Sequence, residues 1–183
     1  MELVKSFKQS KLLKYVFLAL IGSIILAISS KIKIPFYPVP MTMQTLIVLV
    51  IGIGFGWRLG LATVSLYLFE GIIGLPVFSG TPDKGIGLIY FTGPTMGYLI
   101  GFLVAVYISG KFNYDNNLLK NFLKLTLATG FIYILGMSWL GSLIGWDKPI
   151  FQLGAQPFLL AELFKILIVT FAINQIKKIK KLI

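Results

Sequence analysis

Long apolar segments alternate with short polar ones along the chain. A transmembrane helix needs about 20 mostly apolar residues, and this pattern predicts six spans. They cover residues 12–30, 41–55, 59–73, 89–108, 118–144 and 157–175. The second and third are short and contain glycine, so a broken or tilted helix around Gly56, Trp57 and Arg58 is an alternative. The pattern predicts an all-α membrane protein, a bundle of six transmembrane helices in a single domain over residues 1–183.

The composition indicates a protein that is surrounded by lipid. Of its 183 residues, 57% are hydrophobic and only 13% are charged, whereas soluble domains carry about 25% charged residues. The chain has no cysteine and no histidine, which excludes disulfides, thiolate chemistry and imidazole metal ligands. An intramembrane enzyme would need a nucleophile with its base, or a metal cluster. The sequence contains neither pattern, so we predict no enzymatic activity and no bound metal.

The positions of the basic residues predict an orientation. The net charge is +11, and the cations cluster at the termini and between the apolar segments, which argues against nucleic-acid binding. With the N-terminus inside, twelve of the 17 Lys and Arg residues fall in inner segments, four in outer loops and one, Lys165, in a span. This bias follows the positive-inside rule. We therefore predict cytoplasmic termini, an uncleaved first span and a multi-pass protein of the cell inner (plasma) membrane.

The three predicted outer loops share an unusual composition. They cover residues 31–40, 74–87 and 145–156, and contain six of the eight prolines. The other two, Pro94 and Pro157, lie at adjacent ends of spans. Prolines mark turns, but the inner loops also need turns and have no proline. The distribution favours a shaped outer surface over simple turns.

Three ionisable residues fall within predicted spans, where charge is costly and usually functional. Glu162 and Lys165 are separated by three residues, so they share a helix face within about 12 Å of its outer end. They could form an ion pair that holds the helix in place, or a polar clamp at the floor of an outward-facing cavity. The nearby loops favour the clamp. For Glu70 a role at the helix end or in bracing a loop is at least as plausible as ligand contact.

Aromatic and small residues supply further candidates. Most aromatic residues of the outer half are expected to form an interfacial belt, and we select Tyr90 and Trp139 as candidates to line a slot for a flat ring. The first span carries Ala19, Ser23 and Ala27 on one face. Small residues at this spacing allow close helix packing in lipid. The face could serve packing inside the monomer or docking of a membrane partner.

No nucleotide-binding motif is recognisable. Gly52, Gly54 and Gly56 alternate, but no soluble strand precedes them and no G-K-[ST] follows. If ATP drives transport, the ATPase is therefore another chain.

Five segments, in order along residues 39–165, together resemble the BioY family. These are V-P-M-T-M-Q-T-L from Val39, W-R-L-G from Trp57, E-G-I-I-G-L-P-V-F-S-G from Glu70, G-P-T-M-G-Y-L-I-G-F from Gly93 and P-F-L-L-A-E-L-F-K from Pro157. The family comprises the biotin-specific S components, or substrate-binding subunits, of energy-coupling factor (ECF) transporters. The run of motifs is much more specific than any one of them.

The resemblance implies six helices and a biotin site that outer loops close. It also implies that the first helix, with Ala19, Ser23 and Ala27, docks onto a transmembrane coupling subunit with paired ATPases. On this view biotin is the transported ligand, ATP is used only by partner subunits, and no cofactor is needed. An S component for another vitamin, such as riboflavin or thiamin, and a self-sufficient carrier remain alternatives.

The resemblance also suggests binding residues. The Asp and Lys with which the family contacts biotin correspond to Glu162 and Lys165, and Ala161-Glu162 replaces the usual Gly-Asp. Some members have Arg where this chain has Leu99, so Lys84 becomes a candidate partner of the biotin carboxylate. The predicted substrate-binding residues are Glu162, Lys165, Gln44, Lys84, Tyr90 and Trp139.

Overall fold

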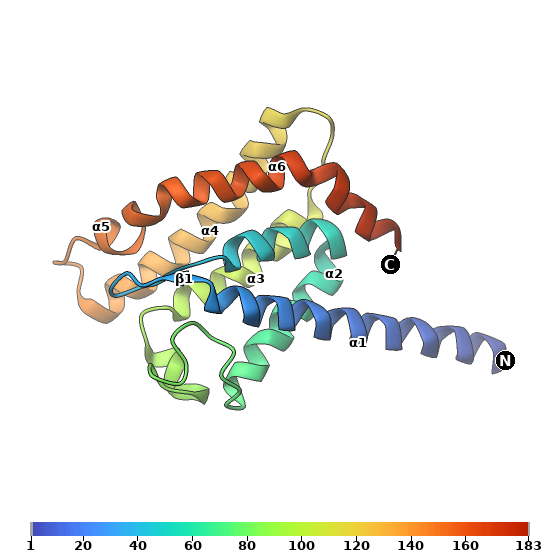
Figure 1. Ribbon diagram of the computed structural model, residues 1–183, viewed down its shortest axis with the longest axis horizontal. Coiled ribbons are helices and arrows are strands. Elements are labelled where there is room, and N and C mark those ends of the chain that lie inside the picture. Colours follow the sequence, from blue (N-terminus) through green and yellow to red (C-terminus); the bar gives the residue numbers. More distant parts are fainter. Residues whose placement is uncertain (1, 183) are drawn as a thin grey trace.

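The computed structural model describes the backbone of residues 2–182 and the side chains of residues 11–180. Most of this chain is helical (Figure 1). The α-helices are α1 (Glu2–Lys31), α2 (Gln44–Ile72), α3 (Met96–Lys111), α4 (Leu118–Ile144), α5 (Ile150–Gly154) and α6 (Leu159–Leu182). The remaining elements are the 3-10 helices η1 (Gly87–Thr92) and η2 (Gln156–Phe158) and the antiparallel strands β1 (Lys33–Ile34) and β2 (Met41–Thr42).

Helix α2 is broken at Gly56, where φ is 75° and ψ is 171°. Figure 1 shows the chain folding back there, so the two halves of α2 run in different directions. Glycine takes this positive φ without the steric cost that a Cβ would add. The halves match the second and third predicted spans. In the described residues there are thus six long helical segments, the number that the sequence predicted.

The described helices are suited to a membrane. Within this part of the chain, four stretches are long and apolar enough to cross one: Lys11–Lys31, Gln44–Ile72, Leu118–Ile144 and Ile150–Lys180. Large apolar side chains point outward from them, such as Phe17 on α1 and Phe171 on α6, which are 63% and 67% exposed. Apolar surface of this extent needs a lipid or protein environment. Together these features indicate a multi-pass membrane protein.

The predicted span 89–108 is wrong at its beginning. Residues 87–92 form η1, Gly93 is extended, and α3 starts only at Met96. Pro94 explains the break, because the residue before a proline avoids the helical conformation. The β1–β2 hairpin was also not predicted, and it delays the start of the next helix to Gln44.

The bundle has two different ends (Figure 1). At one end lie the chain termini, the turn at Gly56 and the α3–α4 connection, and we call it the terminal end. At the other lie residues 32–43, 73–95 and 145–158, which we call the loop end. The three predicted outer loops therefore do gather at one end, opposite the termini. Helix α2 lies between α1, α3 and α6, and it carries buried side chains on most of its length.

Candidate functional site

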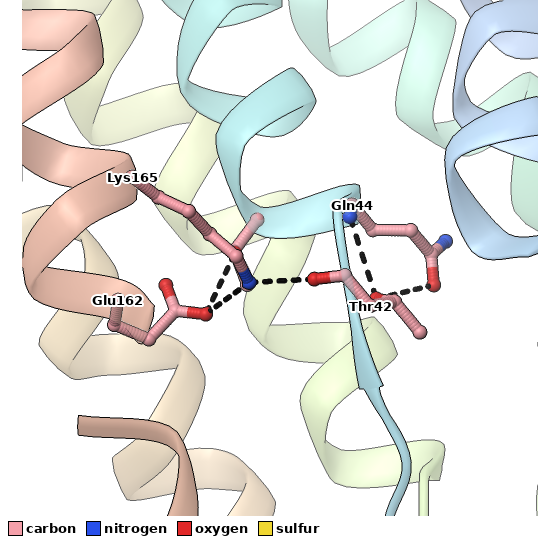
Figure 2. Close-up of polar contacts among 5 residues, drawn as sticks. Thr42, Gln44, Glu162 and Lys165 are labelled. Carbon is pink, nitrogen blue, oxygen red and sulfur yellow. Dashed lines mark hydrogen bonds and ion pairs between the residues drawn. The ribbon is translucent and has the colours of Figure 1, made fainter. Parts of the chain in front are cut away.

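The ion pair predicted on the sixth helix is present and buried. The Lys165 Nζ lies 2.6 Å from the Glu162 Oε1, and each residue is only 5% exposed. Lys165 also donates to the backbone carbonyl of Thr42 in β2 and, over 3.1 Å, to the Thr45 Oγ1 at the start of α2. The Thr45 hydroxyl donates to the same Glu162 oxygen over 2.9 Å. Figure 2 shows the Lys165 side chain reaching from α6 toward the Thr42 carbonyl, with Glu162 beside it.

This network connects α6 to the beginning of α2. A buried ammonium and carboxylate lose their hydration, so they persist only when they pair and form further hydrogen bonds. Here the cation has three acceptors, and the Glu162 Oε1 accepts from two donors. The second carboxylate oxygen, Oε2, is buried without a hydrogen-bond partner. The nearby Tyr133 hydroxyl of α4, or a donor supplied from outside the protein, would satisfy it.

A cavity at the loop end adjoins Glu162. It has a volume of about 50 Å³, so it is smaller than the roughly 300 Å³ or more typical of ligand sites. Its polar lining includes Glu162, Thr42, Gln44, Thr45, Ser79, Tyr90, Thr95, Tyr98 and Tyr133. Its apolar lining is Val39, Pro40, Met41, Leu99, Phe102, Ile132 and Phe158. Aromatic and aliphatic side chains combined with polar groups that converge on one cavity are typical of a small-molecule site.

Two residues that line this cavity each carry a buried polar atom without a hydrogen-bond partner in the described chain. These atoms are the Glu162 Oε2 and the Ser79 Oγ, which belong to residues that are 5% and 4% exposed. An unsatisfied buried polar atom costs about 1–3 kcal/mol. The cavity therefore offers a carboxylate acceptor on α6 and a hydroxyl in the loop that follows α2.

Gln44 and Tyr90 hold the loop end together and also face the cavity. The Gln44 Nε2 donates to the Tyr67 hydroxyl over 2.7 Å, and Tyr67 donates to the carbonyl of Val77 over 3.2 Å. The Tyr90 hydroxyl donates to the carbonyl of Ser79 over 2.7 Å. Burial raises the pKa of Tyr90, which keeps its hydroxyl protonated as that donor. Both side chains thereby fix residues 77–79 against the cavity.

An aromatic cluster anchors the same loop. The Phe78 side chain is 1% exposed, stacks on Tyr90 at 4.7 Å between ring centroids and meets Tyr67 edge to face at 5.3 Å. Gly71 in α2 makes room for it, since a Cβ there would lie 2.0 Å from the Phe78 ring. From α1, Lys31 donates to the Phe78 carbonyl over 2.8 Å. Loop 73–86 is thus tied to α1, α2 and η1.

Three of the six predicted binding residues do not line the cavity: Lys84, Trp139 and Lys165, although Lys165 bonds Glu162, which does line it. Trp139 on α4 does not line it, and its Nε1 donates to the Gly93 carbonyl over 2.9 Å. The indole thereby supports the break between η1 and α3. Lys84 is exposed in loop 73–86, and its aliphatic stem covers Gly80. Of the six predicted residues, the structure brings together Glu162, Lys165, Gln44 and Tyr90 around one region.

The small-residue stripe of α1 faces the protein interior. Ala19 and Ser23 are 7% and 0% exposed, and Ala27 is half-buried. The Ser23 hydroxyl donates over 2.9 Å to the Glu70 Oε1 on α2. Of the two roles left open by the sequence, this burial favours packing within the monomer. The stripe is not an exposed docking face in this structure.

Sequence reasoning overlooked Thr42, Thr45, Ser79 and Tyr133 as cavity residues. Thr42 and Thr45 belong to the segment that begins at Val39, and Ser79 to the segment that begins at Glu70, so the motifs contained them. Nothing in the sequence distinguished Tyr133 within the long apolar helix α4. In the described residues no group of three or more acidic, His or Cys side chains could hold a metal ion.

Comparison with known proteins assigns the family. The model of the BioY family matches residues 4–181. The chain belongs to the BioY family. It is 32% identical over 139 residues to the "Probable biotin transporter BioY" of Pyrococcus horikoshii, which covers 76% of this chain and 81% of that relative. It is also 32% identical over 167 residues to the "Biotin transporter BioY2" of Lactococcus lactis subsp. cremoris, covering 89% of each. BioY proteins are transporters and not enzymes.

A solved structure shares the fold. The crystal structure of "the S-component for biotin from an ECF-type ABC transporter" superimposes with a TM-score of 0.76 over 92% of this chain and 93% of that one, at 22% sequence identity. The BioY chain described here therefore has the fold of an ECF S component. The break in α2, the loop end and the buried pair on α6 are described above for this chain and are not taken from the solved structure.

Proposed function

We propose that this BioY protein binds biotin at the loop end and carries it across the membrane as the S component of an ECF transporter. The observation that carries the proposal is the buried Glu162–Lys165 pair, whose free carboxylate oxygen borders a cavity. Relatives named as biotin transporters support the choice of ligand. On this proposal residues 1–183 act as one substrate-binding unit.

The chemistry of biotin fits the polar groups around the cavity. Its ureido N–H groups are donors for the free Glu162 Oε2. Its ureido oxygen is an acceptor for the Ser79 hydroxyl, which has no partner in the described chain, or for Lys165 or Thr45 when one of their present hydrogen bonds is exchanged. Its thioether ring matches the apolar wall. We assign Gln44 and Tyr90 to the polar lining of the cavity and Lys84 as a candidate partner of the biotin carboxylate. Trp139 supports the break between η1 and α3 through the Gly93 carbonyl.

The cavity of about 50 Å³ is too small for biotin, so binding requires its walls to open. Loop 73–86 is the candidate to move. Its Ser79 lines the cavity, and its movement would have to release the hydrogen bonds from Lys31, Tyr67 and Tyr90 and the packing of Phe78. Movement of this loop would expose the cavity at the loop end.

A binding experiment tests the ligand. Purified protein in detergent should bind biotin with a saturable isotherm in titration calorimetry, and unlabelled riboflavin or thiamin should not displace labelled biotin. Absence of binding above background would contradict the proposal. Displacement by another vitamin, with weaker binding of biotin, would identify the protein as an S component for that vitamin.

Orientation is tested separately. We propose that the termini are cytoplasmic in the plasma membrane and that the loop end faces outward, on the strength of the Lys and Arg distribution. The chain contains no cysteine, so single cysteines can be labelled without background. A membrane-impermeant maleimide added to intact cells should label Lys148→Cys at the loop end and not Lys120→Cys at the terminal end. The reverse pattern would invert the topology.

Coupling to ATP is the remaining part of the proposal. The sequence contains no recognisable nucleotide-binding motif, so on this proposal the ATPases are separate chains that act through a transmembrane coupling protein. Biotin uptake should depend on ECF coupling genes in the host. Undiminished uptake in a host that lacks them would show a self-sufficient carrier.

A further inference from the structure

A basic and aromatic hollow lies at the terminal end, away from the biotin site. Its volume is about 250 Å³. Its lining comes from three helices: Tyr15 of α1, Phe55, Gly56, Trp57, Arg58 and Leu59 around the break in α2, and Lys180 of α6. It contains two cations and three aromatic rings, and no acidic residue.

The geometry around Trp57 is fixed. The backbone of α3 approaches so closely at Gly110 that a Cβ there would lie 2.5 Å from the backbone nitrogen of Trp57. The Trp57 ring meets the Tyr107 ring edge to face at 5.8 Å between centroids. The Arg58 guanidinium carbon lies 5.0 Å from the centre of the Trp57 ring. Stacking of this kind restrains an exposed Arg side chain, so that its N–H groups are held ready for an acceptor.

More positive charge surrounds the hollow. The Lys111 ammonium lies 5.7 Å from the Trp57 ring centre and 4.9 Å from that of Tyr107. Lys180 lies over Gly56, whose Cβ position would be 3.8 Å from the Lys180 Nζ. Among the side chains of residues 11–180, the ion pairs are Lys148–Asp147 and Lys165–Glu162. Arg58, Lys111 and Lys180 therefore have no carboxylate partner in that part of the chain.

A second hollow at the same end has a similar size and a different lining. It has a volume of about 240 Å³ and is lined by Asp115, Asn116, Leu118, Asn121, Thr170, Phe171, Ile173 and Asn174. It carries no cation, so its chemistry is neutral to acidic. The two hollows therefore differ in their lining, although further basic residues such as Lys120 and Lys178 also lie at the terminal end.

We propose that the hollow around Arg58 and Lys180 binds the phosphate headgroup of an anionic phospholipid. Guanidinium and ammonium groups are the standard partners of phosphate oxygens, and basic residues next to membrane-spanning helices attract anionic lipid. The lipid is favoured over a soluble phosphate compound because the hollow lies at the ends of apolar helices. Tyr15, at its edge, is 44% exposed, and the neighbouring Val16 and Phe17 are 50% and 63% exposed, which provides a surface for acyl chains. Aromatic rings such as Tyr15 and Trp57 are common at headgroup depth.

The test uses the full-length protein in neutral detergent micelles. Dioleoyl phosphatidylglycerol, dioleoyl phosphatidylcholine and glycerol 3-phosphate are titrated in separate experiments, and bound ligand is counted by native mass spectrometry. The hollow variant is Arg58→Gln with Lys180→Gln. The control is Lys120→Gln with Lys178→Gln, which removes two cations at the terminal end that do not line the hollow.

Phosphatidylglycerol should bind the hollow variant about tenfold more weakly than the original chain, because each basic residue near the headgroup contributes to attraction. The control should stay within about twofold, as expected for exposed charges that make no specific contact. Thermal unfolding and biotin binding of both variants report whether they are folded. If the double variant fails to fold, Lys180→Gln alone replaces it, compared with Lys178→Gln.

Four results would overturn the proposal. An equal loss of phosphatidylglycerol affinity in the hollow and control variants would show nonspecific charge attraction. Equal binding of phosphatidylcholine would show that the phosphate charge is not recognised, and glycerol 3-phosphate binding as tightly as the lipid would show a site for soluble phosphates. Finally, the hollow variant could retain its lipid affinity and lose co-purification with an ATPase-containing complex. The hollow would then be a protein-docking site.

Discussion

Glu162 and Glu70 are both acidic residues in apolar helices, and their surroundings differ completely. Glu162 is 5% exposed, pairs with Lys165 at 2.6 Å and leaves its second oxygen free beside the cavity. Glu70 is half-buried near the end of α2 and accepts from the Ser23 hydroxyl over 2.9 Å, with no Lys or Arg within ion-pairing distance among the described side chains. The Glu162 carboxylate belongs to a charged network and has one oxygen without a hydrogen-bond partner. The Glu70 carboxylate links α1 to α2.

The difference teaches that a charge within a predicted span has no fixed role. The partners of both residues are distant in sequence, since Thr45 is 117 residues from Glu162 and Ser23 is 47 residues from Glu70. A fully buried carboxylate needs a cation, whereas a half-buried one at a helix end can be solvated in part. The substitutions below test whether this contrast in environment is also a contrast in function.

The largest effect is expected for Lys165→Ala. It leaves the buried Glu162 carboxylate without its cation, and breaking a buried pair in this way costs about 3–5 kcal/mol. Biotin binding should weaken by about 2 kcal/mol or more, roughly 30-fold, if a charged contact is lost. Titration calorimetry measures the affinity. Lys148→Ala is the control, because it breaks an exposed pair with Asp147 that is 3.2 Å long. Unchanged affinity in Lys165→Ala would make the buried pair structural.

A smaller loss is expected for Glu162→Gln, which keeps the size of the side chain and removes its charge. The amide can still accept from Thr45 and Lys165, so we expect biotin affinity to fall about tenfold, in line with the loss of a charge-assisted hydrogen bond. Glu70→Gln is the matched control, since Ser23 can still donate to an amide oxygen. The biotin affinity of Glu70→Gln should remain within about twofold of that of the original chain. Equal losses in both variants would remove the functional distinction between the two acids.

Thr45→Val tests the network around the pair. The substitution keeps the shape of the side chain and removes the hydroxyl that donates to Glu162 and accepts from Lys165. We expect biotin affinity to fall about fivefold, because one net hydrogen bond contributes about 1 kcal/mol. Thr63→Val in the same helix is the control, since its hydroxyl bonds only the Leu59 carbonyl. Identical affinities for the two variants would show that Thr45 does not position the pair.

The smallest effect on binding is expected for Ser23→Ala. The change removes the hydrogen bond between α1 and Glu70 and should lower the free energy of unfolding by about 1 kcal/mol. Thermal unfolding in detergent measures this, and biotin affinity should be unchanged. Ser138→Ala is the control, because its hydroxyl is exposed and bonds the carbonyl of Ile134 in its own helix. A loss of biotin affinity in Ser23→Ala alone would show that the α1–α2 contact affects the site.

The sequence predicted some features well because they depend on local chemistry. The length of the apolar segments predicted six helical spans, and glycine at position 56 indicated the break between the halves of α2. The spacing of Glu162 and Lys165 placed them on one helix face, which the 2.6 Å contact confirms. By contrast, span 89–108 was predicted as one helix although Pro94 divides it.

Predictions of contacts between distant segments were less successful. Trp139 was a candidate for the cavity, but its indole bonds the Gly93 carbonyl instead. Ala19 and Ser23 could have faced a partner, but they pack inside the protein. In both cases the residue type is compatible with two environments, and only the neighbouring helix distinguishes them.

The sequence by itself determined the number of helices, the helix break at Gly56 and the family. The length of an apolar segment, the backbone freedom of glycine and a sequence motif are all properties of continuous segments. Only the tertiary structure decided which polar groups meet. It brought Thr42 and Thr45 to the buried pair on α6, placed Glu162 and Ser79 around one cavity, each with a buried polar atom that lacks a partner in the described chain, and joined Ser23 to Glu70. Such contacts arise from helix packing, where each buried polar group must find a partner from whatever segment lies against it.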